Sequence, residues 1–187
     1  MKKFIIALIC TTWIPTTANA QEKLYIDVTE STIKWIGELT FHFGGHDGFV
    51  NFKEGYFIKT DDVITGGEFI IDMNSITNTD IKQQEGKDNL VNHLKDPDFF
   101  DTKKFPFAKL VITEVNYSDK THARMKADFT LKGITKTINF RVEFNYKERL
   151  MKTRFKIDRK LWNVNYQSKL KNGFISDAIG FEVSVKL

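Results

Sequence analysis

Apolar and polar residues alternate one by one along much of this chain, and this alternation limits the fold more than any other feature. It is clearest from His122 to Leu131, where Arg124 and Lys126 flank Met125. A period of two is typical of β-strands with one buried face and one wet face. The pattern predicts an all-β protein of about eight or nine strands. Further alternating segments are 31–37, 49–52, 55–59, 66–73, 107–115, 138–146, 151–158 and 181–187.

Short segments with glycine or aspartate separate these strands and are expected to form turns. The clearest are Lys132-Gly133, Thr65-Gly66-Gly67 and Asp61-Asp62. The segment from Gly44 to Gly48, which contains His46 and Asp47, is also expected to be a turn.

One segment breaks the alternation. Residues 81–95 are mostly polar, with Leu90, Val91 and Leu94 at helical spacing, which predicts a short helix at about 86–95. This helix either covers one end of the β-structure as a lid or fills a loop at the surface.

The first 20 residues form a separate unit. Lys2 and Lys3 precede a mostly apolar run that ends at Ile14, and Ala18-Asn19-Ala20 has small residues where a signal peptidase reads. The run is shorter than the roughly 20 residues of a membrane-spanning helix. We therefore expect residues 1–20 to be a signal peptide cleaved after Ala20, and residues 21–187 to be one domain. The expected location is the periplasm, or the medium if the source has no outer membrane.

Removing the leader narrows the possible functions. The only cysteine, Cys10, is lost, so disulfides, thiolate ligands and a cysteine nucleophile are excluded from the mature chain. Loss of Lys2 and Lys3 lowers the formal net charge from +4 to +2, which is too weak to indicate binding to nucleic acid. The chain has no nucleophile elbow, phosphate-binding glycine loop or zinc-protease helix, so no catalytic residues are expected.

The histidines give only a weak indication of a metal site. His42 and His46 are four residues apart with Asp47 beside them, but in a regular strand they would lie roughly 13 Å apart. Only a tight turn would bring them together. We favour an ordinary turn histidine beside an aspartate and expect no metal.

About eight antiparallel strands with one apolar face form either two packed sheets or a closed barrel. An eight-stranded barrel is just wide enough to be filled by side chains or to hold one small ligand. The chain has 17 Phe, 5 Tyr and 3 Trp, of which only Phe4 and Trp13 lie in the leader. Composition alone leaves both a ligand cavity and a dense aromatic core open.

A series of motifs along the chain resembles the YceI-like family of lipid- or polyisoprenoid-binding proteins. No single motif is decisive, but their order is specific, and the resemblance runs from about residue 24 to the C-terminus. The motifs are Leu24–Asp27, Ser31–Trp35, Gly67–Thr77, His93–Lys95, Asp98–Asp101, Lys104–Pro106, Asp128–Lys136, Ile157–Arg159 and Ser176–Ile179.

The resemblance implies an extended, lipocalin-like, antiparallel eight-stranded β-barrel with a short helical insertion, exported to the periplasm. It also implies a bound amphiphile, such as an isoprenoid, an isoprenoid quinone or a fatty-acid-like lipid, with its tail inside the barrel. The family has no shared catalytic residues. The chain departs from the commonest family pattern between Trp35 and Gly48, which affects one mouth of the barrel.

If the barrel holds such a ligand, inward-facing residues would contact the tail and a few polar residues would meet the head group. The polar candidates at the mouth are His46, Lys132, Lys136 and Arg159, although an ordinary solvated role is the alternative for each. For the adjacent Asp158 and Arg159 we favour an ion pair that fixes the bend at 159–166; the alternative is that they frame the mouth of the barrel. The predicted interior contacts are Trp35, Phe69, Ile71, Met125, Phe129, Phe140, Phe144, Phe155, Trp162 and Phe181.

Other functions remain open at this stage. One alternative is a structural or stress-associated barrel with a filled core and a protein partner. Another is a small outer-membrane β-barrel, in which the apolar residues would face lipid instead of the interior. We expect no stable membrane insertion, and a homodimer is possible.

Overall fold

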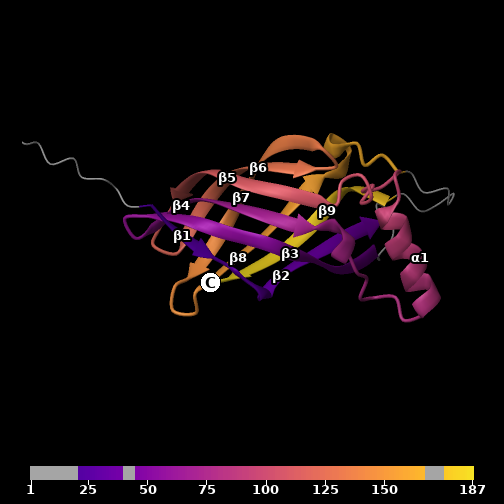
Figure 1. Ribbon diagram of the computed structural model, residues 1–187, viewed down its shortest axis with the longest axis horizontal. Coiled ribbons are helices and arrows are strands. Elements are labelled where there is room, and N and C mark those ends of the chain that lie inside the picture. Colours follow the sequence, from indigo (N-terminus) through magenta and orange to yellow (C-terminus); the bar gives the residue numbers. More distant parts are fainter. Residues whose placement is uncertain (1–20, 40–44, 167–174) are drawn as a thin grey trace, which may run out of the picture.

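The computed structural model describes residues 21–39, 45–166 and 175–187 (Figure 1). The predicted leader and His42 lie outside the described residues. The helices are α1 (Gln84–Lys95) and two 3-10 turns, η1 (Met73–Ser75) and η2 (Arg159–Trp162). The strands are β1 (Gln21–Tyr25), β2 (Asp27–Leu39), β3 (Gly45–Thr60), β4 (Val63–Asp72), β5 (Phe107–Tyr117), β6 (His122–Leu131), β7 (Ile134–Asn145), β8 (Leu150–Asp158) and β9 (Ile175–Lys186).

The strands form one antiparallel sheet that closes on itself. Their order is β1-β3-β2-β9-β8-β7-β6-β5-β4, and a further pairing of β3 with β4 completes the circle. β1 and β2 pair with successive parts of the same edge of β3, residues 56–60 and 45–50. They therefore share one position, and the barrel has eight. The predicted all-β, eight-stranded antiparallel barrel with a short helix is confirmed.

The predicted alternation sorts residues between the inside and the outside of the wall. On β6, Met125 and Ala127 are fully buried, whereas Arg124 and Lys126 between and beside them are exposed. Apolar side chains from all the strands meet in one core inside the barrel.

β3 differs from the sequence-based expectation. Segments 49–52 and 55–59 were predicted as separate strands, yet they belong to one strand of 16 residues. A register shift between Phe52 and Glu54 marks a β-bulge, which changes the inward-facing positions from even to odd numbers. A bulge adds one unpaired residue, so it breaks the alternation without ending the strand.

The prediction of a turn from Gly44 to Gly48 was also wrong for its described residues. His46 and Gly48 lie in β3, paired with Gly37 and Trp35 of β2. A Cβ on Gly48 would lie 1.9 Å from the carbonyl oxygen of Thr77. Glycine is needed there because another segment crosses close to the strand, not because the chain turns.

Thr65-Gly66-Gly67 is likewise part of a strand, β4, and not a turn. The β3–β4 turn is formed by Asp61 and Asp62, whose φ angles are 50° and 68°. Positive φ at both central residues is typical of the tight hairpin turn that matches strand twist. The predicted turn at Lys132-Gly133 is confirmed, with φ angles of 51° and 74°.

Helix α1 lies at one end of the barrel (Figure 1). It begins at Gln84, about two residues before the predicted start, and ends at Lys95 as expected. Leu94 is buried, and Leu90 and Val91 pack against the core. Among the described residues, no helix combines the length and apolar character needed to cross a membrane.

We predict that Gly48→Ala destabilises the protein by roughly 1–3 kcal/mol, because the new methyl group must displace the segment at Thr77. Urea denaturation followed by circular dichroism measures this change. The matched control is Gly66→Ala, where the nearest heavy atoms would be 3.5 Å away, an ordinary contact distance. Equal stability of the two variants would contradict the close-approach explanation.

Candidate functional site: an apolar cavity inside the barrel

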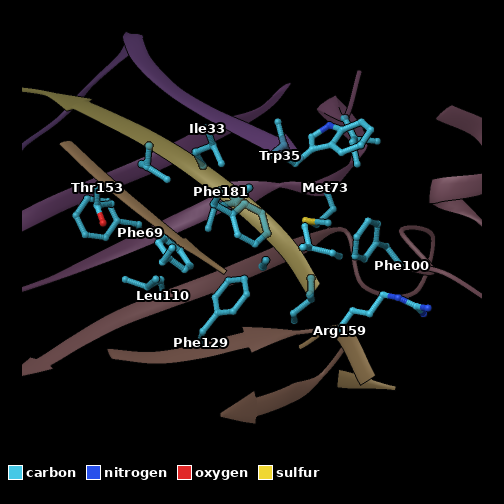
Figure 2. Close-up of a pocket in the computed structure, with 18 of the residues that line it drawn as sticks. Ile33, Trp35, Phe69, Met73, Phe100, Leu110, Phe129, Thr153, Arg159 and Phe181 are labelled. Atoms are coloured by element: carbon cyan, nitrogen blue, oxygen red, sulfur yellow. The ribbon is translucent and has the colours of Figure 1, made fainter. Parts of the chain in front are cut away.

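The barrel encloses a cavity of about 130 Å³ (Figure 2). All strands from β2 to β9 contribute to its wall, which is almost entirely apolar. The few lining residues with polar groups include Thr153, Arg159 and Ser176. Thr153 donates its hydroxyl hydrogen to the carbonyl oxygen of Arg141 at 2.6 Å, so this polar group is already satisfied within the wall.

Eight of the ten residues that the sequence predicts as interior contacts line this cavity. Their contact with a ligand stays a prediction, but their position around one space is observed. They are Trp35, Phe69, Ile71, Met125, Phe129, Phe140, Phe155 and Phe181.

Trp162 is buried in the core but does not line the cavity. Its indole N–H donates to the carbonyl oxygen of Phe129 at 3.1 Å, and its ring packs edge-on against the Phe129 ring at 5.6 Å. Trp162 therefore contacts a cavity-lining residue, Phe129, without lining the cavity itself. It belongs to η2 and not to a strand, so alternation gives no information about its direction.

Phe144 is also buried outside the cavity, at the end of the barrel away from α1. Its ring packs against those of Phe57, Tyr117 and Tyr146. Alternation correctly predicts that Phe144 faces inward. The pattern does not show how far along the barrel the open space extends.

The end of the cavity near α1 is formed mostly by residues that the strand pattern does not include. Leu94 of α1 and Phe99 and Phe100 of the following turn are buried and line the cavity, as do Met73 and Ile76. The helix and this turn thus cover the end of the barrel, which favours the lid over the surface-loop alternative. In the sequence, the helical spacing of Leu94 and the two adjacent phenylalanines that follow the helix were the signals that could have predicted this end of the cavity.

Arg159 lines the cavity with a side chain that is only 2% exposed. Its Nε donates to the carbonyl oxygen of Ser176 at 3.1 Å, Nη1 donates to that of Val164, and Nη2 lies 3.4 Å from Asp177. Its nitrogen atoms point away from the centre of the cavity (Figure 2). Arg159 therefore joins the end of β8 to the start of β9, and its aliphatic stem faces the cavity.

The prediction of an ion pair between Asp158 and Arg159 was wrong. Asp158 instead accepts a hydrogen bond from the backbone N–H of Lys160 at 3.0 Å, as the N-cap of η2. Asp158 is exposed at the end of β8, whereas the side chain of Arg159, the first residue of η2, is buried, so the two side chains do not meet. The acidic partner of Arg159 is Asp177.

The other polar candidates do not face the cavity. Lys132 donates from Nζ to the carbonyl oxygens of Pro97 at 2.8 Å and Asn163 at 3.2 Å, which links three segments at the α1 end. Lys136 is exposed. His46 lies on the outer surface, with Nδ1 2.8 Å from Asp80.

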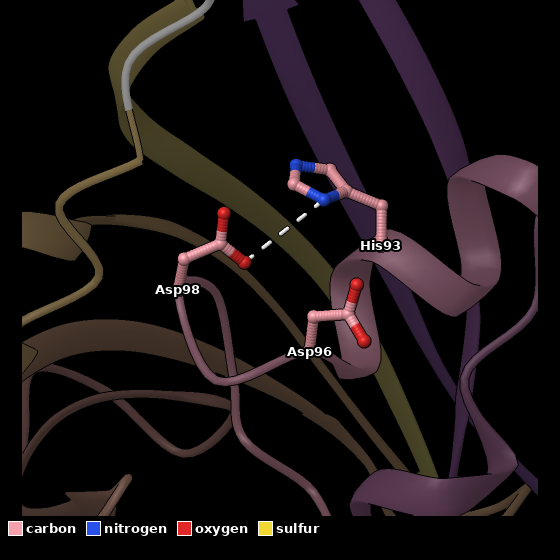
Figure 3. Close-up of side chains that lie close together, drawn as sticks. All are labelled: His93, Asp96 and Asp98. Atoms are coloured by element: carbon pink, nitrogen blue, oxygen red, sulfur yellow. Dashed lines mark ion pairs between the residues drawn. The ribbon is translucent and has the colours of Figure 1, made fainter.

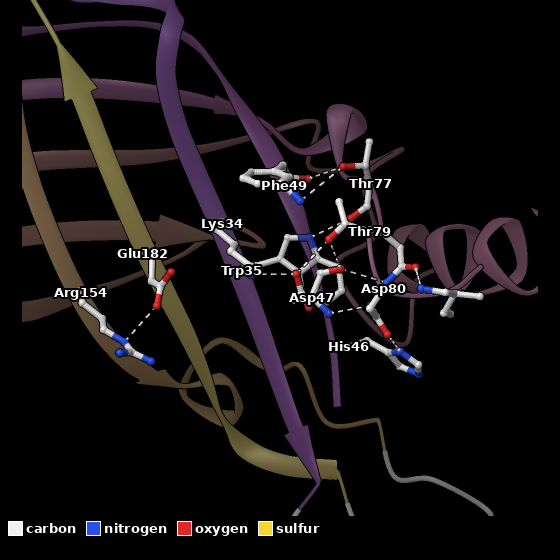
Figure 4. Close-up of polar contacts among 12 residues, drawn as sticks. Lys34, Trp35, His46, Asp47, Phe49, Thr77, Thr79, Asp80, Arg154 and Glu182 are labelled. Atoms are coloured by element: carbon white, nitrogen blue, oxygen red, sulfur yellow. Dashed lines mark hydrogen bonds and ion pairs between the residues drawn. The ribbon is translucent and has the colours of Figure 1, made fainter. Parts of the chain in front are cut away.

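A polar network holds the segment between η1 and α1 against β3 (Figure 4). The backbone N–H groups of Thr77 and Thr79 donate to the carbonyl oxygens of Phe49 and Asp47 at 2.8 and 2.9 Å. The Trp35 indole N–H donates to the Thr77 carbonyl oxygen at 3.0 Å. Because Trp35 also lines the cavity, this network connects the cavity wall to the segment that leads into α1.

Asp80 is the acidic centre of the network. Partial burial favours its neutral form, but hydrogen bonds from His46, the Asp47 N–H and Asn78 favour the carboxylate, and the net effect lowers its pKa below the ordinary value of 3.8. The ionised form of Asp80 therefore stabilises the folded state.

His93, Asp96 and Asp98 come together at the C-terminal end of α1 (Figure 3), with one ligand atom of each within 4.8 Å of the others. The His93 Nδ1 lies 4.0 Å from Asp98, while its buried Nε2 has no hydrogen-bond partner among the described residues. Metal-binding histidines usually donate the second ring N–H to an acceptor, and the described part of the chain offers His93 no such acceptor. The cluster is therefore better described as an acidic pair facing a histidine that packs edge-on against Tyr166, with ring centroids 4.3 Å apart.

The closed barrel and its apolar cavity define a lipocalin-like barrel protein. The chain belongs to the YceI-like family, because the family model described as the YceI-like domain matches residues 24–187.

Relatives and solved structures agree with this assignment. UPF0312 proteins of Pseudomonas putida strains W619 and GB-1 are 42% and 40% identical over 53 residues. This stretch is 28% of this chain and 28% of those proteins, so the match spans less than a third of the relatives.

Among solved structures, BcnA of Burkholderia cenocepacia has a TM-score of 0.70 at 15% identity, over 86% of this chain and 98% of that one. A mutant Campylobacter jejuni YCEI protein, made for nanotechnology applications, has a TM-score of 0.50 at 15% identity, over 98% and 97% of the two chains. Because the sequence identity to both structures is only 15%, the structural similarity shows a shared fold and nothing more.

We predict that Asp80→Asn lowers the free energy of unfolding at neutral pH, and that the difference from wild type shrinks as the pH falls below about 4. Because the folded-state pKa of Asp80 is lowered, the stability it supplies is present above its unfolded pKa and is lost as the pH falls through the folded value. Urea denaturation at a series of pH values measures both curves. Asp88→Asn, on the exposed side of α1, controls for the loss of one charge. A stability difference between Asp80→Asn and wild type that did not depend on pH would contradict the stabilising role of the Asp80 carboxylate.

Proposed function

We propose that this protein is an exported binding protein, and not an enzyme, that holds the tail of an isoprenoid, an isoprenoid quinone or a fatty-acid-like lipid inside its barrel. Storage, carriage and protection of that molecule are the roles consistent with such binding. The observation that carries the proposal is the apolar cavity, which all strands from β2 to β9 surround.

The chemistry of the cavity supports a hydrocarbon ligand. Each methylene that moves from water into an apolar site gains roughly 0.8 kcal/mol. Burying a polar group without a hydrogen-bond partner costs several kcal/mol, and the wall offers few partners because Thr153 and Arg159 already bond to the protein. The site therefore favours tails over head groups.

The size of the cavity supports uptake of a short length of hydrocarbon tail. Its volume of about 130 Å³ is close to that of apolar cavities of about 150 Å³ that take up benzene or xenon. Sites that enclose drug-sized ligands have roughly 300–1,000 Å³. The cavity thus holds a ring or a short segment of chain, and a longer tail requires movement of flexible lining side chains such as Met73, Met125 and Met151.

The charged residues on the outer face of the barrel support the proposal that water, and not lipid, surrounds it. Arg124, Lys126 and Arg141 are exposed on β6 and β7. Such a charge costs about 2–4 kcal/mol at the middle of a bilayer, which disfavours an outer-membrane barrel. Together with the leader pattern of residues 1–20, this supports a periplasmic protein.

A barrel with a filled core and a protein partner is the second candidate. It is favoured by the aromatic packing of Phe140 on Phe155 and of Phe155 on Phe181, with ring centroids 5.0 and 5.4 Å apart. These rings occupy part of the interior.

Extraction of a natural ligand separates the two candidates. Protein purified from its native compartment without detergent is expected to release a long-chain lipid into organic solvent, detected by mass spectrometry. Repeated preparations without lipid, together with no uptake of added prenyl or acyl compounds, would favour the filled-core candidate.

We predict that Leu110→Trp reduces binding of a long-chain alcohol at least tenfold while the protein stays folded. Leu110 lines the cavity, so the larger side chain occupies the space that the tail needs (Figure 2). The matched control is Val111→Trp, which adds the same side chain at the next position of β5, on the other face of the wall. Isothermal titration calorimetry measures both variants. Equal loss of binding in the two would show that the cavity is not the site.

A further inference from the structure

On one side of the barrel the cavity ends well before the strands do, whereas on β8 and β9 its lining extends to Met151 and Val185, near the far ends of those strands. On β4 to β7 the last residues that line it, counted away from α1, are Phe69, Ile112, Met125 and Phe140. Beyond them lies a solid layer of side chains that we term the end plug. The end plug consists of Phe57, Ile64, Tyr117, Ala123, Val142 and Phe144.

The end plug is tightly packed. Phe57 is fully buried, and Phe144 is 6% exposed. The Phe144 ring stacks on Tyr117 at 5.9 Å and meets Phe57 edge-on at 6.5 Å. Across the sheet, Phe144 pairs with Met151, which lines the cavity. Phe144 is therefore close to the point where the open space stops.

Hydrogen bonds fix the end plug to the wall. The Tyr117 hydroxyl accepts from the backbone N–H of Ile64 at 3.0 Å and donates to the Ile64 carbonyl oxygen at 3.2 Å. Burial raises the pKa of Tyr117 above its ordinary value, so the hydroxyl remains a donor at neutral pH. Both bonds join β5 to β4 across the end of the barrel, which holds the aromatic rings in place.

The opposite end of the cavity is closed differently. There Leu94, Phe99 and Phe100 come from α1 and its following turn, which lie outside the strand ladder. A tail that enters from the α1 end has its far end toward the end plug.

We propose that the end plug is a fixed stop that limits the length of the bound tail, with Phe144 as the residue that sets the limit. This inference rests on the proposed function. The ligands it selects have one apolar tail with an uncharged terminus, because the hydroxyl of Tyr117 is already bonded to the backbone and offers nothing to a polar group. Amphiphiles with a polar group at each end are excluded.

A series of straight-chain primary alcohols, lengthened by one methylene at a time, tests the stop. Isothermal titration calorimetry on the whole mature protein, without detergent, measures each affinity. For wild type, affinity rises about fourfold per methylene, the equivalent of roughly 0.8 kcal/mol, until the tail reaches the end plug, and is then constant. In Phe144→Ala this rise continues to longer alcohols. A diol of a length that binds as the simple alcohol is expected to bind at least tenfold more weakly.

Two further variants make the result decisive. Tyr146→Ala removes a ring that also stacks on Phe144 but is half exposed, so it should leave the limiting length unchanged. If Phe144→Ala does not fold, Phe144→Leu makes a smaller change and should still extend the series. An unchanged limit in a folded Phe144 variant would overturn the stop. Failure of wild type to bind any alcohol would instead overturn the proposed function.

Discussion

Closure of the sheet at β3 creates the barrel interior and therefore the cavity within it. β3 pairs with β4 on one edge and with β2 and β1 on the other, so it is the strand at which the sheet becomes a circle. With eight positions around the circle, the interior is wide enough for inward side chains and little more. The volume left over is then decided by which side chains point inward at each level. Phe140, Phe155 and Phe181 narrow the middle, and small residues such as Gly37 and Ala108 leave room.

The two ends of the barrel are closed by different means, and this difference gives the cavity a direction. At one end Tyr117 and Phe144 are part of the strand ladder. At the other end, Phe99 and Phe100 belong to a turn outside the ladder, which the side chain of Lys132 holds through its hydrogen bond to the carbonyl oxygen of Pro97. Segments with few ladder hydrogen bonds open at lower free energy than core strands. Opening is therefore expected at the α1 end, close to Arg159, which joins β8 to β9 there.

Most of the architecture could be predicted from the sequence, because strand alternation reports directly on which side of a sheet a residue lies. This explains why residues such as Met125 and Phe129 were placed correctly. Alternation fails where the backbone does not follow it, as at the bulge after Phe52 and at Trp162 in a 3-10 turn. Glycine was the other source of error. Gly48 lies in a strand and lets the segment at Thr77 cross close to it, but in the sequence a glycine there is typical of a turn. The depth of the cavity could not be predicted, because it depends on how rings from distant strands pack around Phe144.

We infer that the barrel contains a water-free space that accepts hydrocarbon. A crystal structure of the mature protein under xenon pressure tests it most directly, because xenon enters apolar cavities of this size. We predict a xenon atom among Phe69, Phe129 and Phe181, with the side chains around it little changed. Ordered water in that space, or an interior filled by side chains with no xenon, would contradict it.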